Sequence, residues 1–399
     1  MNISDVNYEN LQVVINKYFR VNQVVFGSQN KPFIMQFQGE FLDQDTEKIF
    51  MQLEKELKEY GVIPLFRKED TSNLIFLVKK PEKPQPLKPS INLILFFFTL
   101  ISVLLTGGLY GFTGELSADA GQMFTELIKS GWPFAIALLS ILAAHEFGHY
   151  FAGKRHGVQV TLPYFIPFPF SIFGTMGAFI NMRSLPRNKR ELFDLAITGP
   201  LSGLIVSIIV LFIGLSLSTL GSLPSAPASE ISIQMEGNSL IYLLIKYLTF
   251  GKLLPSPTNL EGSSLIIFWL QYFFTGKPFP WGALDVLLHP VAWAGWAGIF
   301  VTGLNLIPTG QLDGGHIFYA LFGKKTSQFL FPIIISALIL MGFFWNTWWI
   351  WAALLFILGR RYAEPLDQIT ELDTKRKWLG FLGLITFIVT FIPVPIAIY

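Results

Sequence analysis

The residues best suited to chemistry are two histidines and a glutamate in a His-Glu-x-x-His pattern, at His145, Glu146 and His149. Residues four apart lie on one face of a helix, so both imidazoles can reach one metal ion, with Glu146 beside it to take a proton from water. The pattern also occurs by chance in soluble helices, but this copy stands inside an apolar run, where ionisable groups are costly. We therefore predict a metal site. The alternatives are that the three side chains hydrogen-bond one another or that they face a water-filled vestibule.

A catalytic zinc site typically has three protein ligands and an open position, so this pattern needs a third ligand. Asp313 is the best candidate, because Pro308 and Gly310 break the preceding helix and present the carboxylate from unwound backbone. The alternative for Asp313 is a turn or a helix cap. His156 follows Lys154 and Arg155 at the end of the second apolar run, and we expect it to be a solvated residue at the membrane edge. Asp194 opens the next run, where a helix N-terminal charge is the expected role.

Composition places these residues in a membrane protein. Of the 399 residues, 52% are hydrophobic and only 14% are charged, and the mean hydropathy is +0.50. Soluble domains have about 25% charged residues. The absence of cysteine excludes disulfides, thiolate ligands and cysteine nucleophiles, so any metal must be held by histidines and carboxylates. The net charge of +2 is too small to indicate a nucleic-acid partner.

The patterning divides the chain into three parts. Residues 1–82 read as a small soluble α/β domain, with helices expected over 8–19 and from a cap at Asp45 through Tyr60, and strands over 33–41 and 74–78. This part lacks the features of a signal peptide, so we expect the N-terminus to stay on the side where the chain is made. Residues 83–90 are a linker. Residues 91–399 form a membrane-embedded domain, with the catalytic helix at about 132–153 and the third-ligand motif at 305–316.

Basic residues orient the membrane part, because Lys and Arg gather on the cytoplasmic side. The basic groups are Lys154, Arg155, residues 183–190, Lys324, Lys325, Arg360, Arg361 and residues 375–377. The loops near Glu115 and Glu230 lack such groups and are expected on the other side. This arrangement puts the histidine-bearing end of the second span toward the cytoplasm.

The apolar runs predict a polytopic α-helical membrane protein with about seven to nine membrane segments, each long helix needing roughly 20 residues to cross the bilayer. Residues 240–274 contain two shorter apolar runs, which suit either a helical pair or two half-spans. Residues 160–182 differ, because three prolines argue against a simple spanning helix. Irregular backbone at membrane depth survives where protein shields it or where it lines a wet cavity, so we expect a re-entrant hairpin there.

Taken together, these motifs resemble the site-2 protease family of membrane-embedded zinc metalloproteases. The resemblance rests on the His-Glu-x-x-His helix and on a distant Leu-Asp-Gly motif, here residues 312–314. The resemblance implies Zn²⁺ held by His145, His149 and Asp313, Glu146 as the catalytic base, and Asn305 as a residue that orients substrate or the oxyanion. Residues 173–180, 199–203 and 289–313 are more narrowly similar to the plant chloroplast and cyanobacterial branch called ethylene-dependent gravitropism-deficient and yellow-green. Some members of that branch carry Arg at the position of His316, which is expected to support a ligand at most.

The function that follows from the resemblance is hydrolysis of peptide bonds in transmembrane substrates within the bilayer. The segment from Gly174 through Gly177 to Ile180 is expected to offer a strand edge to the unwound substrate, although a purely structural loop is an equal alternative. Asn181 and Thr198 are candidates to line a water path, or else ordinary helix-packing residues. The main rival function is a metal or proton transporter using the same ligands, which predicts acidic or histidine residues on several further helices. A catalytically silent scaffold is a third reading, and it predicts the loss of Glu146 or of a ligand.

Overall fold

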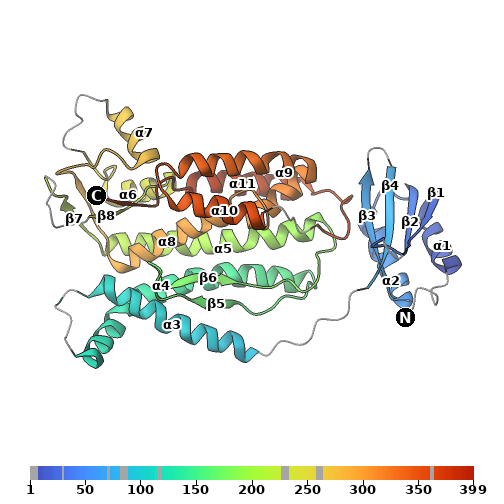
Figure 1. Cartoon of the computed structure of the whole chain (residues 1–399), viewed down its shortest axis with the longest axis horizontal. Helices are drawn as coiled ribbons and strands as arrows, with labels where there is room; N and C mark the ends of the chain where they lie inside the picture. Colours follow the sequence, from blue (N-terminus) through green and yellow to red (C-terminus); the bar gives the residue numbers. More distant parts are fainter. Residues whose placement is uncertain are drawn as a thin grey trace.

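The structure is a computed structural model, and it describes residues 8–28, 31–69, 72–80, 89–112, 114, 119–225, 233–257, 264–359 and 364–399. Figure 1 shows a small mixed domain at one end of the molecule, formed by the N-terminal residues, and a bundle of long helices beside it. The chain's C-terminus and the strands β7 and β8 lie at the end of the bundle that is remote from the N-terminal domain. The expected linker at residues 83–90 lies mostly outside the described residues.

The N-terminal domain is an antiparallel sheet with strand order β1-β2-β4-β3, carrying helices that pack on its apolar core. Its elements are α1 (Tyr8–Asn16), β1 (Phe19–Phe26), β2 (Met35–Phe41), α2 (Thr46–Leu57), a 3-10 turn (Lys58–Tyr60), β3 (Val62–Glu69) and β4 (Ser72–Lys79). Asp45 caps α2 as predicted, by accepting a hydrogen bond from the Lys48 backbone N–H. The sheet and its core are those of the small α/β domain that we expected at this end of the chain.

The first helix of this domain is shorter than predicted. We expected it to run to Phe19, but α1 ends at Asn16 and Phe19 begins a strand that the sequence reading missed. Phe19 is fully buried, and its ring lies edge-on to Phe41 of β2 with the centroids 4.9 Å apart. Phe19 fits the helical spacing of the apolar residues before it, but it is buried by a partner on the neighbouring strand, and the prediction therefore placed the end of the helix too late.

The N-terminal domain docks on the loop before α11 and on the segment before α5. The edge strand β3 exchanges backbone hydrogen bonds with residues 366–368: Phe66 donates to the Leu366 carbonyl at 3.0 Å and accepts from Gln368 at 3.1 Å. Arg190 pairs with Glu47 at 2.5 Å, and Arg187 pairs with Glu54 at 3.1 Å. This contact covers a sheet edge that would otherwise be open to pairing with another chain.

The rest of the described chain is helical, with short two-stranded sheets. Its helices are α3 (Pro89–Gly111), α4 (Ala120–Arg155), α5 (Lys189–Ser216), α6 (Leu240–Phe250), α7 (Leu265–Thr275), α8 (Pro290–Asn305), α9 (Asp313–Met341), α10 (Thr347–Leu358) and α11 (Thr374–Thr390). In the described part of the chain, four of them, α3, α4, α5 and α9, are long and apolar enough to cross a membrane. Gly323 has a φ of 79° and divides α9 into two helical segments at a kink. The larger span count stays a prediction.

The segment predicted as a hairpin forms one. Strands β5 (Tyr164–Pro167) and β6 (Thr175–Phe179) pair antiparallel, and the hairpin packs mainly against α3. The Asn92 amide donates to the carbonyls of Leu162 and Pro163 at 2.9 and 3.0 Å, and the Ser102 hydroxyl donates to the Gly174 carbonyl at 2.6 Å. These buried polar contacts fix the irregular backbone on α3. The depth of the hairpin in a membrane stays a prediction.

The end of the bundle remote from the N-terminal domain is closed by two small antiparallel sheets. Strand β7 (Thr219–Ser222) pairs with β9 (Leu284–Leu287), and β8 (Gln234–Glu236) pairs with β10 (Ile396–Ile398). The two apolar runs of residues 240–274 are the separate short helices α6 and α7, and neither is long enough alone to cross a bilayer.

Candidate metal centre

Helix α4 presents the predicted catalytic residues on one buried face. His145, Glu146 and His149 are 5%, 5% and 8% exposed. The helix runs from Ala120 to Arg155, so it starts well before the predicted 132 and ends close to the predicted 153. Because His145 and His149 are one helical turn apart, their imidazoles point the same way, and their Nε2 atoms lie 3.1 Å from each other.

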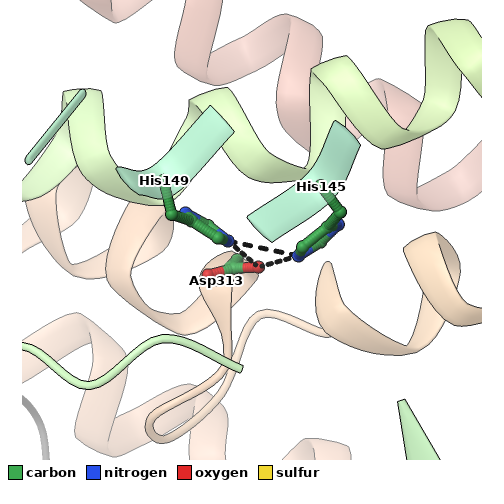
Figure 2. A group of neighbouring side chains, drawn as sticks. All are labelled: His145, His149 and Asp313. Carbon is green, nitrogen blue, oxygen red and sulfur yellow. Dashed lines mark hydrogen bonds and ion pairs between the residues drawn. The ribbon is translucent and has the colours of Figure 1, made fainter. Parts of the chain in front are cut away.

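Asp313 reaches these histidines from the start of α9. Its Oδ2 lies 3.4 Å from Nε2 of His145 and 3.3 Å from Nε2 of His149. Figure 2 shows the three side chains converging on one point between α4 and the loop that enters α9. The structure thus brings Asp313 next to the two histidines, and its role as a metal ligand stays a prediction.

The three atoms are spaced as ligands of one zinc ion would be. Zinc–nitrogen and zinc–oxygen bonds of about 2.0–2.1 Å at tetrahedral angles separate neighbouring ligand atoms by roughly 3.3 Å. Their observed separations are 3.1, 3.3 and 3.4 Å. Among the described residues, this is the one group of at least three His, Cys, Asp or Glu residues whose ligand atoms lie within 4.8 Å of one another. The donor set therefore fits Zn²⁺.

Hydrogen bonding sets the tautomer of His149 in the form that a metal requires. Its Nδ1 lies 2.6 Å from the backbone carbonyl of Leu195, a group that only accepts hydrogen bonds, so Nδ1 carries a proton. In the neutral imidazole, Nε2 then carries a lone pair, which is directed at the Asp313 carboxylate and at the His145 imidazole. A neutral ring can offer neither of them a proton, so a shared cation is the natural partner for the three atoms.

Glycines on α5 allow the helix to pass close behind the ligands. A Cβ at Gly199 would stand 2.1 Å from Nε2 of His149, and a Cβ at Gly203 would stand 3.1 Å from Cβ of His145. At Gly148 of α4, a Cβ would meet the hydroxyl of Ser202 on α5 at 2.3 Å. The two helices therefore approach closely at the level of the ligands because these positions have no side chain.

Replacing Gly199 with Ala should therefore damage the metal centre. The new methyl group would occupy the place of the His149 imidazole, which cannot turn away without losing its hydrogen bond to Leu195. We expect the purified variant to contain clearly less zinc than the wild type when metal content is measured by atomic emission. Gly121→Ala is the control, since a Cβ there meets only the Asp119 carboxylate at 3.3 Å near the start of α4. Equal zinc content in both variants would contradict the close approach.

Glu146 stands beside the ligand atoms but outside the ligand cluster. Its Oε1 lies 4.0 Å from Nε2 of His145. A buried carboxylate at this position is within reach of a water molecule held among the ligands, and it is free for proton transfer because it is not part of the donor set.

A cavity of about 230 Å³ opens beside the ligands. Besides Glu146 and the three ligand residues, its lining includes Ala178, Phe179, Ile180, Asn305 and His316. The hairpin strand β6 and the residue after it therefore form one wall, while the end of α8 and the start of α9 form another. The cavity brings a strand, a buried carboxylate and a metal-type donor set together in one space.

The residues predicted to contact substrate occupy different places. Asn305 lines the cavity, and its Nδ2 lies 3.4 Å from Nε2 of His145. Gly174 and Gly177 belong to the hairpin but are not among the cavity-lining residues. Both have positive φ values, 72° and 98°, and a Cβ at Gly174 would stand 2.7 Å from the Ser102 carbonyl oxygen of α3. Gly174 therefore lets the hairpin pack on α3, and substrate contact at either glycine stays a prediction.

The two rejected ligand candidates pair with each other instead. His156 Nε2 lies 2.9 Å from Oδ2 of Asp194, which also accepts from Arg376 Nη2 at 2.6 Å. The expectation that His156 would be simply solvated is therefore wrong: the sequence gives no sign of a partner that comes from another helix. Thr198 and Asn181 lie outside the cavity lining, and the Thr198 hydroxyl donates to the Asp194 carbonyl of its own helix.

The sequence did not predict one contributor to the site and indicated only a supporting role for another. The Leu195 carbonyl, which orients His149, is a backbone atom, so no residue type reveals it. His316, which lines the cavity, was assigned a supporting role at most. The signal that could have raised its importance is its spacing, since it follows Asp313 by three positions on the same helix and so shares its face.

Comparisons with known proteins agree with this geometry. Residues 133–346, more than half of the chain, match the family described as Peptidase family M50. The chain is similar to the Arabidopsis thaliana proteins named probable zinc metalloprotease EGY2, chloroplastic, with 29% identity over 278 residues, and EGY1, chloroplastic, with 27% identity over 277 residues. Each match covers 68% of this chain, and 43% and 45% of the respective relative. The chain thus aligns with less than half the length of these relatives. No solved structure matches the chain.

Proposed function

The chain belongs to peptidase family M50, and from this premise we propose that it is an intramembrane zinc metalloendopeptidase that hydrolyses peptide bonds of transmembrane proteins. The observation that carries the proposal is the convergence of His145, His149 and Asp313 beside Glu146 at one cavity. The ligands come from two helices far apart in the sequence, and the described residues contain no second group of this kind.

The roles of the side chains follow from their positions. His145, His149 and Asp313 would hold the metal, which when bound polarises the scissile carbonyl and lowers the pKa of the attacking water to about 7. Glu146 accepts a proton from that water and delivers it to the leaving amine, because it is close to the ligands without being one. The Asn305 amide, 3.4 Å from the His145 nitrogen, is placed to hold the substrate carbonyl.

The hairpin supports a substrate in extended form. Strand β6 pairs with β5 alone among the described strands, which leaves its other edge unpaired, and its end lines the cavity at Ala178 and Phe179. A transmembrane helix must give up its own hydrogen bonds before its peptide bond can be cut. An added strand on β6 would replace those bonds and bring the unwound peptide next to Glu146.

The membrane setting completes the proposal. We infer a multi-pass protein of about seven to nine segments, with the N-terminal domain on the cytoplasmic or stromal side. In support, Arg187 and Arg190 contact that domain, and Lys324 pairs with Glu364 close to the segment on which it docks. Relatives named as chloroplastic support a chloroplast membrane, and a bacterial plasma membrane or thylakoid would suit the same chain.

A transporter is the less favoured function. It would need further polar sites on several helices, forming a path across the bilayer. Asp285, one of the few remaining acidic residues of the apolar runs, lies on strand β9, and its carboxylate accepts from the Val286 backbone N–H at 2.8 Å. The structure thus provides one cluster of metal-type donors in its described part, not a series of them.

Removal of the metal tests the proposal. Purified wild-type protein in proteoliposomes should cleave a peptide that contains a transmembrane segment, stop doing so after 1,10-phenanthroline treatment, and recover when Zn²⁺ is restored. Cleavage is measured by mass spectrometry of the fragments, and zinc flux is followed in the same vesicles with an entrapped indicator. Metal flux without any proteolysis would contradict the proposed function.

A further inference from the structure

His316 is a buried histidine that lines the cavity, and its ring interacts with the Gln311 backbone. It is 7% exposed, and its Nδ1 is inaccessible and without a hydrogen-bond partner among the described residues. A buried polar atom is normally paired, and an exception calls for an explanation. If His316 served only to fill space, an apolar side chain would do so without the cost of burying an unpaired nitrogen.

The imidazole stands in the reaction space without belonging to the metal cluster. It lines the same cavity as Glu146 and Asn305. The group of ligand atoms within 4.8 Å of one another contains His145, His149 and Asp313 but not His316, so His316 is not a fourth member of the donor set. His316 lines the cavity while its Nδ1 is inaccessible, so Nε2 is the ring nitrogen from which we infer a contact with substrate.

The helix start that carries His316 is held in place. A Cβ at Gly314 would stand 2.0 Å from the Leu306 carbonyl oxygen, and a Cβ at Gly315 would stand 2.5 Å from the Gly310 carbonyl oxygen. The first turn of α9 therefore packs directly against the backbone of the loop before it. Asp313 and His316, three apart on one face, are presented by the same rigid turn.

We propose that His316 is a catalytic residue that donates a hydrogen bond from its imidazole to the carbonyl oxygen of the scissile peptide bond as that oxygen becomes an oxyanion. This inference rests on the proposed function. An imidazole protonated on Nε2, whether neutral or charged, offers an N–H to the cavity. Fixed donors aimed at a developing negative charge stabilise the transition state more than the bound substrate.

The test compares two variants of the full-length protein. His316→Leu replaces the imidazole with an apolar side chain of similar size and so removes the N–H donor. Its kcat should fall by about 10²–10³-fold, with KM and zinc content unchanged. His316→Gln keeps an N–H donor, and its kcat should exceed that of the leucine variant by about tenfold. Thr302→Val is the matched control: it removes a buried hydroxyl that donates only to Gly298 of its own helix, and it should leave kcat unchanged.

Several outcomes would overturn the role of His316 while leaving the proposed function intact. They are wild-type kcat in His316→Leu, a rise in KM alone, equal loss in the leucine and glutamine variants, and loss of zinc from His316→Leu. Loss of zinc would mean that the imidazole supports the ligands instead of contacting substrate. Absence of proteolysis by the wild type, by contrast, would contradict the proposed function itself, and the kinetic comparison separates the two.

Discussion

Replacing Glu146 with Gln is expected to abolish peptide hydrolysis while leaving zinc bound. The glutamine has nearly the same shape, but its amide cannot take a proton from water at neutral pH, and general acid–base groups typically contribute about 10²–10⁴-fold to rate. Metal binding should persist because the Glu146 carboxylate lies outside the ligand cluster, with Oε1 4.0 Å from the nearest ligand nitrogen. Cleavage of a transmembrane peptide and zinc content are measured on the same preparation.

Glu126→Gln is the matched control for this substitution. Glu126 lies on the same helix, outside the cavity lining, so the change of carboxylate to amide should leave cleavage near the wild-type rate. If Glu146→Gln cleaved as fast as the wild type, Glu146 would not be the base. If it lost its zinc as well, the loss of activity would report a damaged metal centre instead of a missing proton acceptor.

Replacing Asp313 with Ala is expected to remove the zinc. The variant keeps the two imidazoles, whose Nε2 atoms are 3.1 Å apart. It loses the Asp313 Oδ2 atom, which lies 3.3 Å from Nε2 of His149 and 3.4 Å from Nε2 of His145. Loss of a residue that only supports a ligand typically lowers metal affinity about 10–100-fold, so loss of the ligand itself should exceed about 100-fold. Competition with a zinc chelator of known affinity measures the change, and peptide cleavage should fall to background.

Asp285→Asn controls for the loss of a buried carboxylate as such. Asp285 is 4% exposed but lies on β9, which pairs with β7 at the end of the bundle remote from the N-terminal domain, and this variant should keep its zinc. Zinc affinity in Asp313→Ala equal to that of the wild type would mean that a different group completes the site. The convergence in Figure 2 would then be a contact without a metal role.

Much of the metal centre could be predicted from the sequence, because several of its residues are close together in the chain. His145, Glu146 and His149 share a helix, and helical spacing alone places both imidazoles on one face. The cap of α2 at Asp45 was predictable for the same reason, since a capping side chain bonds a backbone group three residues on. The hairpin at 160–182 could be read from its prolines and glycines, which exclude a continuous helix.

Other features depended on partners that no neighbouring residue reveals. Phe19 continues the apolar spacing of α1, yet it became a strand residue because Phe41 lies opposite it. His156 looked solvated until a second helix supplied Asp194. The contact of β3 with residues 366–368 joins two distant parts of the chain through backbone atoms, which every residue possesses and which therefore leave no trace in composition.

The sequence by itself determined which residues can bind a metal and the spacing of two of them, because a helix repeats its geometry over neighbouring residues. Only the tertiary structure decided that Asp313 meets both histidines, that the Leu195 carbonyl orients one of them, and that His316 faces the same cavity. The physical reason is that such contacts follow from how whole helices pack, and packing here depends on positions without side chains, such as Gly199 and Gly315, that let backbones approach.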